Sequence, residues 1–269
     1  MLHTLAASAN IKLNGNEDLI LDAGSGLTTT EFENACALSA IQAKDIVPKV
    51  VAREKALTVR KNGVLEIVEA NVGLDQIGGL NIAKPWIEIR KKAFSKDAKR
   101  YGLPTPKGIL LVGVPGAGKS LFCKAVSTGF GVPMLKLDGG KIFGSLVGES
   151  ERNMREAIMT AEAIAPCVLQ IDEIEKSFSG SKSSGQTDGG TSARVMGSFL
   201  QWLQEKTAPV FVVATANDVS QLPPELLRKG RFDEVWFVDL PNEDERREIW
   251  AIQIAKHGRK PTDFDMDAL

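Results

Sequence analysis

Residues that bind metals or form cross-links are scarce in this sequence, which has three cysteines and two histidines among its 269 residues. Cys36, Cys123 and Cys167 lie far apart in apolar neighbourhoods, with no C-x-x-C motif and no histidine nearby. This pattern excludes a cysteine-based metal site and indicates buried, reduced thiols, and hence a reducing compartment. His3 and His257 are isolated, and we expect both at the surface.

Long apolar runs and an excess charge of one sign are also missing. No window approaches the ~20 apolar residues that span a bilayer, and residues 1–10 lack the features of an export signal. A net charge of -1 provides no field that would draw the chain to nucleic acid or to an anionic membrane. With 43% hydrophobic and 25% charged residues, we expect a soluble globular protein of the cytoplasm or a plastid stroma, without membrane insertion or a nucleic-acid partner.

Five short, nearly continuous apolar runs recur from the middle of the chain onward. Each is typical of a strand buried on both faces of a parallel sheet, and stretches of helical periodicity such as 150–164 and 194–206 separate them. The alternation of strand and helix predicts an α/β fold with a five-stranded parallel sheet flanked by helices. The five runs are residues 108–112, 133–137, 167–171, 209–215 and 235–239.

Residues 1–70 differ from this pattern, and we expect them to form a mainly helical segment, interpreted as the end of a larger domain. The run from Thr28 to Glu31 is a capping box that opens a helix, and a second helix is predicted around 46–61, ending near Gly63. The core is then expected at 71–258. Within it, the glycine- and serine-rich stretch 178–191 is predicted to be a mobile loop.

A phosphate-binding loop follows the first buried strand of this core. Residues 113–120 match the pattern G-x-x-x-x-G-K-[ST], at the start of a predicted helix over 121–128. Backbone N–H groups of such a loop and the helix N-terminus surround the phosphates of ATP, while Lys119 reaches the β- and γ-phosphates and Ser120 ligates Mg²⁺. The alternative, a glycine-rich turn with a solvated lysine, does not explain the position between strand and helix. The candidate ATP-binding residues are Gly113, Val114, Pro115, Gly116, Ala117, Gly118, Lys119, Ser120 and Leu121.

Two adjacent carboxylates end another buried strand, 167–171, where ligands of open α/β sheets bind. Asp172 is the candidate Mg²⁺ ligand. Glu173 is positioned to orient and deprotonate a water that attacks the γ-phosphate. An Asp-Glu pair alone would be read as a solvated strand end, and the phosphate loop favours the catalytic interpretation. Gln170 is unusual in a buried strand and faces either a polar neighbour or another subunit.

A third motif, Leu-Leu-Arg-Lys-Gly-Arg-Phe-Asp at 226–233, completes a resemblance to the AAA family of ATPases. The resemblance extends from Val72 to Leu269 and opens with Leu-Asp-Gln-Ile-Gly-Gly-Leu at 74–80. Within the family, residues 101–108 and 171–176 are most similar to AAA proteins encoded by cyanobacteria and algal plastids. The implied fold is a P-loop NTPase core.

The resemblance implies roles that spacing alone does not provide. Ile77 and Gly78 match the residues that contact adenine, and Asn217 matches the polar sensor that holds the attacking water beside Glu173. Arg228 and Arg231 match the arginine fingers that enter a neighbouring subunit's site, so a homo-oligomer, typically a hexameric ring, is implied. The alternative for the two arginines is a surface turn bonded to Asp233 or Glu225.

Two features depart from the family pattern. Leu146, within 144–151, stands where threading members place an aromatic pore residue, and leucine offers less contact area to a threaded chain. The helical lid that follows the core in family members is represented here by residues 259–269, interpreted as the start of a truncated lid.

The leading interpretation is an ATPase that hydrolyses ATP in an oligomeric ring and remodels an unidentified protein partner. The alternative is an ATP-dependent switch or scaffold with slow or no hydrolysis. A third interpretation, an ATPase acting on nucleic acid, would depend on a cluster of basic residues on a predicted helix. The apolar side chains of this segment, Trp86, Ile89 and Phe94, are expected to turn inward. These basic residues are expected to form an ordinary solvated helix face. They are Arg90, Lys91, Lys92, Lys96, Lys99 and Arg100.

Overall fold

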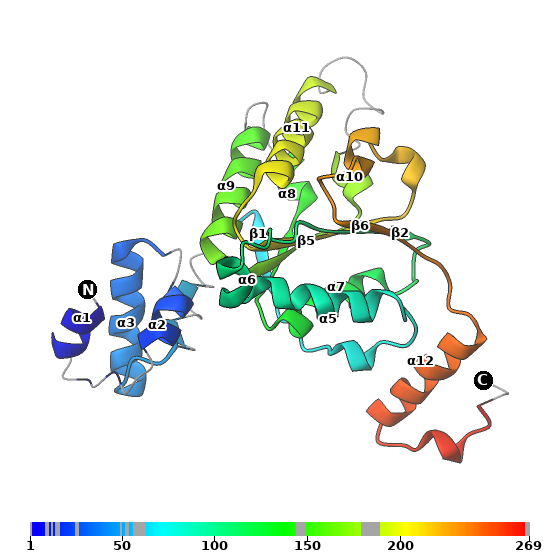
Figure 1. The fold of residues 1–269 in the computed structure, drawn as a ribbon, viewed down its shortest axis with the longest axis horizontal. Helices are drawn as coiled ribbons and strands as arrows, with labels where there is room; N and C mark the ends of the chain where they lie inside the picture. The colour runs from blue at the N-terminus through cyan, green and yellow to red at the C-terminus, as the bar shows by residue number, and fades with distance from the viewer. Residues whose placement is uncertain are drawn as a thin grey trace.

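A computed structural model describes most of the chain. The described residues are 2–8, 11, 13, 17–24, 27–48, 50–51, 54–55, 63–143, 149–178 and 189–266. They form a central sheet with helices on both faces, an N-terminal group of helices beside it, and a C-terminal helix that projects from it (Figure 1). Leu146 and most of the glycine- and serine-rich stretch lie outside the described residues.

The sheet has six strands in the order β1-β3-β4-β5-β2-β6. The five parallel strands predicted from the sequence are confirmed. A strand buried on both faces cannot place polar groups in solvent, so its sequence is a continuous apolar run, and β2, β4 and β5 are buried along their whole length. The parallel strands are β2 (Gly108–Gly113), β3 (Met134–Leu137), β4 (Cys167–Ile171), β5 (Val210–Ala216) and β6 (Glu234–Val238).

The strand count of five was wrong, because a sixth strand joins the sheet. Strand β1 (Leu65–Val68) pairs antiparallel with β3, with Leu65 opposite Leu137 and Val68 opposite Met134. It lies within the segment 1–70 that was expected to be mainly helical, so the sheet begins before the expected start of the core at 71. With four residues and Glu66 exposed among them, β1 gives a periodic signal too short to recognise.

Helices cover the two faces of the sheet (Figure 1). One face packs against α8 (Gly139–Phe143), α9 (Glu149–Ile164), α10 (Ile174–Phe178) and α11 (Gly189–Glu205). The other packs against α5 (Ala83–Lys91) and α7 (Lys119–Phe130), where Phe211 of β5 contacts the rings of Phe94 and Phe130. Short helices η1 (Leu74–Gln76), η2 (Lys92–Phe94) and α6 (Lys96–Arg100) flank α5. After β5 follow η4 (Val219–Gln221) and η5 (Pro224–Leu227).

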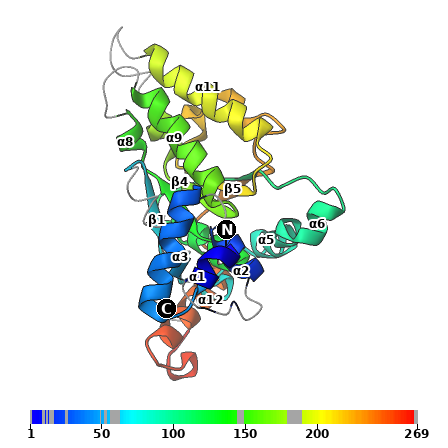
Figure 2. The same cartoon turned by 90° about the vertical axis from the view of Figure 1, so that its left-hand side faces the viewer.

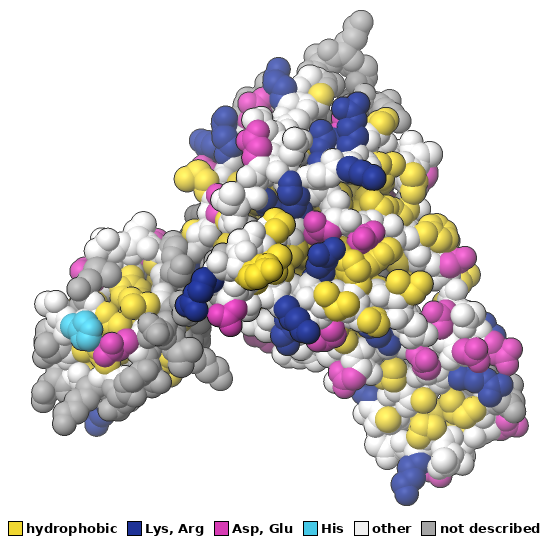
Figure 3. Space-filling model, viewed as in Figure 1, with side chains coloured by type: hydrophobic (Ala, Val, Ile, Leu, Met, Phe, Trp, Pro, Cys, Tyr) yellow, Lys and Arg dark blue, Asp and Glu magenta, His cyan; other side chains and the backbone are white. Residues whose placement is uncertain are grey.

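The basic segment differs in two respects from its prediction: its residues lie on the three short elements α5, η2 and α6 and not on one helix, and one apolar side chain faces outward. Trp86 and Phe94 pack against the core as expected, whereas Ile89 is 65% exposed and points away from it. The Arg90 guanidinium lies over the Trp86 ring at 4.7 Å. Basic and acidic side chains are interspersed over the face of the molecule drawn in Figure 3, so no single-sign patch dominates that face.

The N-terminal helices α1 (Leu2–Ser8), α2 (Glu17–Gly24) and α3 (Thr29–Ala43) have a hydrophobic cluster of their own. They face the viewer in Figure 2. The predicted capping box is present: the Thr28 hydroxyl accepts from the Glu31 N–H at 3.3 Å, and Glu31 accepts from the Thr28 N–H at 2.9 Å. The second predicted helix, 46–61, lies partly outside the described residues. Buried Lys55 joins this region to the core, because its Nζ donates to the Ile164 carbonyl at 3.2 Å.

Helix α12 (Glu243–Lys256) leaves the sheet after β6 and contacts the segment that precedes α5. Glu248 accepts from the Gly79 N–H at 2.8 Å, and a Cβ at Gly78 would lie 2.7 Å from the Ile249 nitrogen. Residues beyond α12 form a short helix η6 (Pro261–Asp263). None of the helices within the described ranges combines the length and the apolar character that spanning a bilayer requires.

Candidate functional site

The loop between β2 and α7 has a conformation that its glycines make possible. Gly116 and Gly118 have φ angles of 84° and 87°, in the left-handed region that residues with a Cβ rarely adopt. Gly113 lies so close to β6 that a Cβ would be 1.8 Å from the Val238 carbonyl oxygen. The loop therefore curls tightly over the carboxyl end of the sheet before α7 begins at Lys119.

A pocket of about 350 Å³ opens beside this loop. It is bounded by the loop on one side and by the ends of β4 and β5 on the other, and most of the expected loop and strand-end residues meet there. The lining residues are Pro115, Gly116, Gly118, Lys119, Ser120, Leu121, Asp172, Glu173, Thr215 and Asn217.

Lys119 supplies a buried positive charge at the floor of the pocket. Its Nζ donates to the carbonyl oxygens of Gly113 at 2.7 Å and Val114 at 2.8 Å, and to Asn217 Oδ1 at 2.9 Å. Burial lowers the pKa of Lys119, whereas the three nearby carboxylates act in the opposite direction. Three hydrogen bonds thus hold the ammonium in place within the loop.

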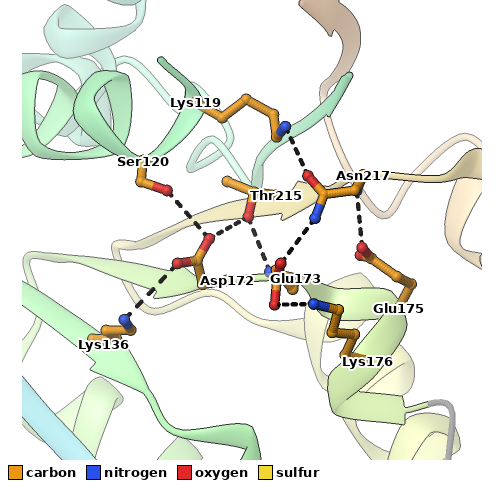
Figure 4. Close-up of polar contacts among 9 residues, drawn as sticks. All are labelled: Lys119, Ser120, Lys136, Asp172, Glu173, Glu175, Lys176, Thr215 and Asn217. Atoms are coloured by element: carbon orange, nitrogen blue, oxygen red, sulfur yellow. Dashed lines mark hydrogen bonds and ion pairs between the residues drawn. The ribbon is translucent and has the colours of Figure 1, made fainter. Parts of the chain in front are cut away.

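Asp172 accepts hydrogen bonds at one oxygen from two hydroxyl groups. Thr215 Oγ1 donates to Oδ1 at 2.5 Å, and Ser120 Oγ lies 3.4 Å from the same oxygen (Figure 4). The second oxygen, Oδ2, lies 3.8 Å from the Lys136 ammonium. A carboxylate beside a serine hydroxyl presents the hard oxygen donors that Mg²⁺ prefers.

Mg²⁺ bound to a nucleotide needs few protein ligands, because phosphates and waters provide the others. In the described part of the chain, no group of three or more His, Cys, Asp and Glu side chains could by itself hold a metal ion. The pairing of Ser120 with Asp172 therefore fits Mg²⁺ that arrives with phosphate, and does not fit an all-protein metal cage.

Glu173 follows Asp172 in a strained backbone conformation, with φ at 47°. Its N–H donates to Thr215 Oγ1 at 3.0 Å, which helps to hold this geometry. Its carboxylate is held from two sides: Asn217 Nδ2 donates to Oε1 at 2.9 Å, and the Lys176 ammonium lies 2.9 Å from Oε2. The hydrogen bond to Glu173 raises the pKa of Lys176.

Asn217 connects the two halves of the pocket. Its side-chain amide accepts from Lys119 and donates to Glu173, and its own N–H donates to Glu175 Oε1 at 2.9 Å. Glu175 is buried, and its Oε2 has no hydrogen-bond partner within the described chain. Since the amide orientation follows from these two neighbours of opposite charge, Asn217 is fixed with its oxygen toward the lysine.

Four residues of this network were not singled out from the sequence: Thr215, Lys136, Glu175 and Lys176. Thr215 is a buried threonine at the end of an apolar run. A buried hydroxyl needs a hydrogen-bond partner, so this threonine could have been predicted to contact a polar group of the site. Lys136 lies on β3 in register with Gln170 of β4, so the unusual polar residue of β4 has a polar neighbour. The other two follow Glu173 on α10, where the sequence does not reveal which side chains turn back to the site.

Seven expected site residues do not line the pocket: Gly113, Val114 and Ala117 of the loop, and Ile77, Gly78, Arg228 and Arg231. Ile77 is buried in the core, and Gly78 packs against α12, so neither lines the pocket itself. Arg228 is exposed, and Arg231 is half-buried with its guanidinium donating to the Glu225 carbonyl oxygen.

Within the described part of the chain, Asp233 does not pair with these arginines. Its Oδ2 accepts instead from the N–H groups of Lys107 at 2.7 Å and Gly108 at 3.0 Å. The turn 228–231 is held by the contact of Arg231 with the Glu225 carbonyl oxygen and by Lys107 Nζ, which donates to the Gly230 carbonyl oxygen at 2.7 Å.

Fold and site together define a P-loop NTPase core. Five parallel strands carry a glycine loop, a buried lysine, and two adjacent carboxylates at the end of β4. Comparison with protein families matches residues 109–240 to the ATPase family associated with various cellular activities (AAA). This core is an AAA domain.

Among known proteins, the chain is similar to AAA proteins named ycf46. It is 52% identical over 207 residues to the "Uncharacterized AAA domain-containing protein ycf46" of Pyropia yezoensis, which covers 77% of this chain and 42% of that protein. For the protein of the same name in Guillardia theta, the identity is 46% over 242 residues, or 89% of this chain and 47% of that protein. The chain thus spans less than half the length of these relatives.

A more distant similarity links the chain to the "Peroxisomal ATPase PEX6" of Arabidopsis thaliana. The identity is 31% over 213 residues, which cover 77% of this chain and 22% of that protein.

Replacing Thr215 by valine is expected to weaken Mg²⁺ binding at this site about tenfold. Valine has a similar shape but removes the hydroxyl that donates to Asp172 and accepts from the Glu173 N–H. The measurement is a Mg²⁺ titration of the binding of a fluorescent ATP analogue. Thr215→Ser keeps the hydroxyl and serves as the control, with an expected Mg²⁺ requirement like that of the unmodified chain. Equal requirements in the valine and serine variants would contradict the role given to Thr215.

Proposed function

We propose that this chain binds ATP with Mg²⁺ in the pocket beside residues 113–120 and hydrolyses it to ADP and phosphate. The observation that carries the proposal is the convergence of Lys119, Asp172, Glu173 and Asn217, from three different segments, on one pocket. AAA membership supports nucleotide binding in general. The reaction itself is our inference from the geometry.

Each side chain has a distinct part in the proposed reaction. Lys119 leaves its loop carbonyls to bind the β- and γ-phosphates, and the loop N–H groups surround them. Ser120 and Asp172 hold Mg²⁺, which neutralises the charge that develops on the phosphates. Glu173 accepts a proton from the attacking water, and Asn217 fixes both Glu173 and that water. Adenine lies toward Ile77 and Gly78, beside α12.

We also propose that the site is completed by a second copy of the chain. Arg228 and Arg231 lie outside their own pocket on the turn after η5, where a neighbouring subunit can receive them. In a closed ring, each subunit then supplies arginines to the next, and a hexamer is the proposed assembly. Arg231 has to leave the Glu225 carbonyl to act in this way.

We propose that the ring remodels a protein partner. Its proposed location is the cytoplasm or the plastid stroma, where it would be a soluble protein. The similarity to a peroxisomal ATPase supports an energy-using role in general terms. A switch or scaffold that reads ATP against ADP is the second candidate, favoured by Leu146 in place of an aromatic residue. The number of ATP molecules hydrolysed per partner molecule released distinguishes the two candidates. A switch needs about one turnover per release, whereas a threading motor needs many.

The substitution Glu173→Gln is expected to lower ATP hydrolysis by about 10²- to 10⁴-fold, the usual contribution of a positioned base. Glutamine keeps the side-chain shape and the acceptor for Asn217, so ATP binding should change by less than about threefold. Phosphate release and fluorescent nucleotide titration measure the two effects.

The control for this experiment is Glu205→Gln, which removes a carboxylate at the end of α11, away from the pocket. It should hydrolyse ATP at the unmodified rate. Undiminished hydrolysis by the Glu173→Gln variant would refute the role of Glu173.

Mixing two inactive variants tests the shared site. Arg228→Ala/Arg231→Ala keeps an intact pocket without fingers, and Lys119→Ala keeps the fingers without a working pocket. Each alone should be nearly inactive, and an equal mixture should regain activity at about a quarter of the sites, because half of the pockets are intact and half of their neighbours supply arginines. Full activity of the double arginine variant alone, or no recovery on mixing, would exclude the shared site.

A further inference from the structure

Lys107 lies directly before β2 and joins the end of α11 to the arginine turn, residues 228–231. Its Nζ donates to the carbonyl oxygen of Gly230 at 2.7 Å and to that of Gln204, the penultimate residue of α11. The Gln204 carbonyl belongs to the last turn of the helix, where carbonyl groups have no partner within the helix itself. One ammonium group therefore satisfies the helix end and holds the arginine turn.

The main chain beside Lys107 is fixed on both sides. The Lys107 N–H donates to Asp233 Oδ2 at 2.7 Å, so the chain just after the arginine turn is held to the start of β2. On the other side, the Pro106 carbonyl oxygen accepts from the ammonium of buried Lys206 at 3.2 Å. Because its backbone is anchored in this way, Lys107 presents its ammonium at a defined position beside the turn.

The contact from Lys107 lies where the arginine turn has the most backbone freedom. Gly230 is exposed between Arg228 and Arg231, and its φ angle is 93°. Glycine has more backbone freedom than any other residue, so a hydrogen bond at its carbonyl restricts the directions of both flanking arginines. In the proposed reaction Arg231 leaves the Glu225 carbonyl, and the bond from Lys107 is then a contact that keeps the turn in place.

The length of β2 separates Lys107 from the pocket of its own chain. Strands β2 and β6 are parallel neighbours (Figure 1), so Lys107 and the arginine turn, which precede them, lie at the amino end of the sheet. The phosphate loop follows the other end of β2, at Gly113. Lys107 does not line the nucleotide pocket. A change at Lys107 should therefore act on the arginines and not on nucleotide binding by the same chain.

We infer that Lys107 is a positioning residue that sets the direction of Arg228 and Arg231 and so governs ATP hydrolysis in the neighbouring subunit's site. This inference rests on the proposed function, in which those arginines enter that site. Lys107 acts through the Gly230 carbonyl, so its effect on hydrolysis is exerted across the interface between two copies of the chain.

Replacing Lys107 by methionine keeps an apolar stem and removes the donor to Gly230. We expect kcat for ATP hydrolysis to fall about three- to tenfold, as for the loss of a partly exposed hydrogen bond from a charged group. KM for ATP and the affinity for a fluorescent ADP analogue should change by less than about twofold, because the pocket itself is intact. Arg100→Met, which removes another exposed cation, should leave kcat and KM unchanged.

Mixed assemblies show in which subunit Lys107 acts. Lys119→Ala supplies arginines without a working pocket, and Arg228→Ala/Arg231→Ala supplies a pocket without the arginines. Lys107→Met added to the Lys119→Ala chain should lower the activity recovered on mixing about three- to tenfold, because the supplied arginines are misdirected. The same substitution added to the double arginine variant should leave the recovered activity unchanged, because that chain supplies no arginine of the turn.

The outcomes separate the inference from the proposed function. Loss of recovered activity only when Lys107→Met is in the arginine-supplying chain would support the positioning role. Recovery that is unchanged, or lowered as much when the substitution is in the pocket-supplying chain, would overturn that role and leave the shared site standing. Absence of recovery on mixing the chains without Lys107→Met would overturn the shared site and the inference together.

Discussion

The hydrogen bonds of Asn217 connect the parts of this site that lie far apart in the sequence. The residue follows the central strand β5, which lies between β4 and β2 in the sheet. Its amide therefore reaches Lys119 beyond β2 and Glu173 beyond β4, each at 2.9 Å. Any change in strand order would separate these three side chains. The buried, parallel sheet is thus what converts separate segments into one pocket.

Charge around the pocket is balanced by more lysines than the motifs identify. Asp172 and Glu173 face Lys136 and Lys176 as well as Lys119. A polyphosphate with Mg²⁺ would compete for both kinds of charge, since phosphate attracts the lysines and Mg²⁺ attracts Asp172. Binding would then rearrange existing ion pairs around Asp172 and Glu173.

The sequence predicts the parts of the fold and site whose physics is local. Continuous apolar runs predicted the five parallel strands. The pattern at 113–120 predicted the loop, because the turn requires its glycines and phosphate binding requires the charge of Lys119. Asp172 and Glu173 were found because they end such a run. Lys119, Asp172 and Glu173 line one pocket, and their roles stay predictions.

Features that depend on distant contacts were missed. Strand β1 has four residues and is defined by its pairing with β3. Ile89 was expected to be buried from its apolar character, yet its environment depends on how α5 meets the sheet. The partners of Thr215 and Lys176 likewise depend on how β4, β5 and α10 meet. Arg228 and Arg231 concern a second copy of the chain, and their role stays a prediction.

The central claim, that residues 113–120 bind ATP with Mg²⁺ through Lys119, is tested most directly by calorimetric titration of the purified chain with ATP in the presence of Mg²⁺. The account predicts saturable binding of one nucleotide per chain, weakened at least about tenfold in Lys119→Ala, because a charge-assisted contact to phosphate is lost. Absence of saturable binding, or equal affinity in the two proteins, would contradict it.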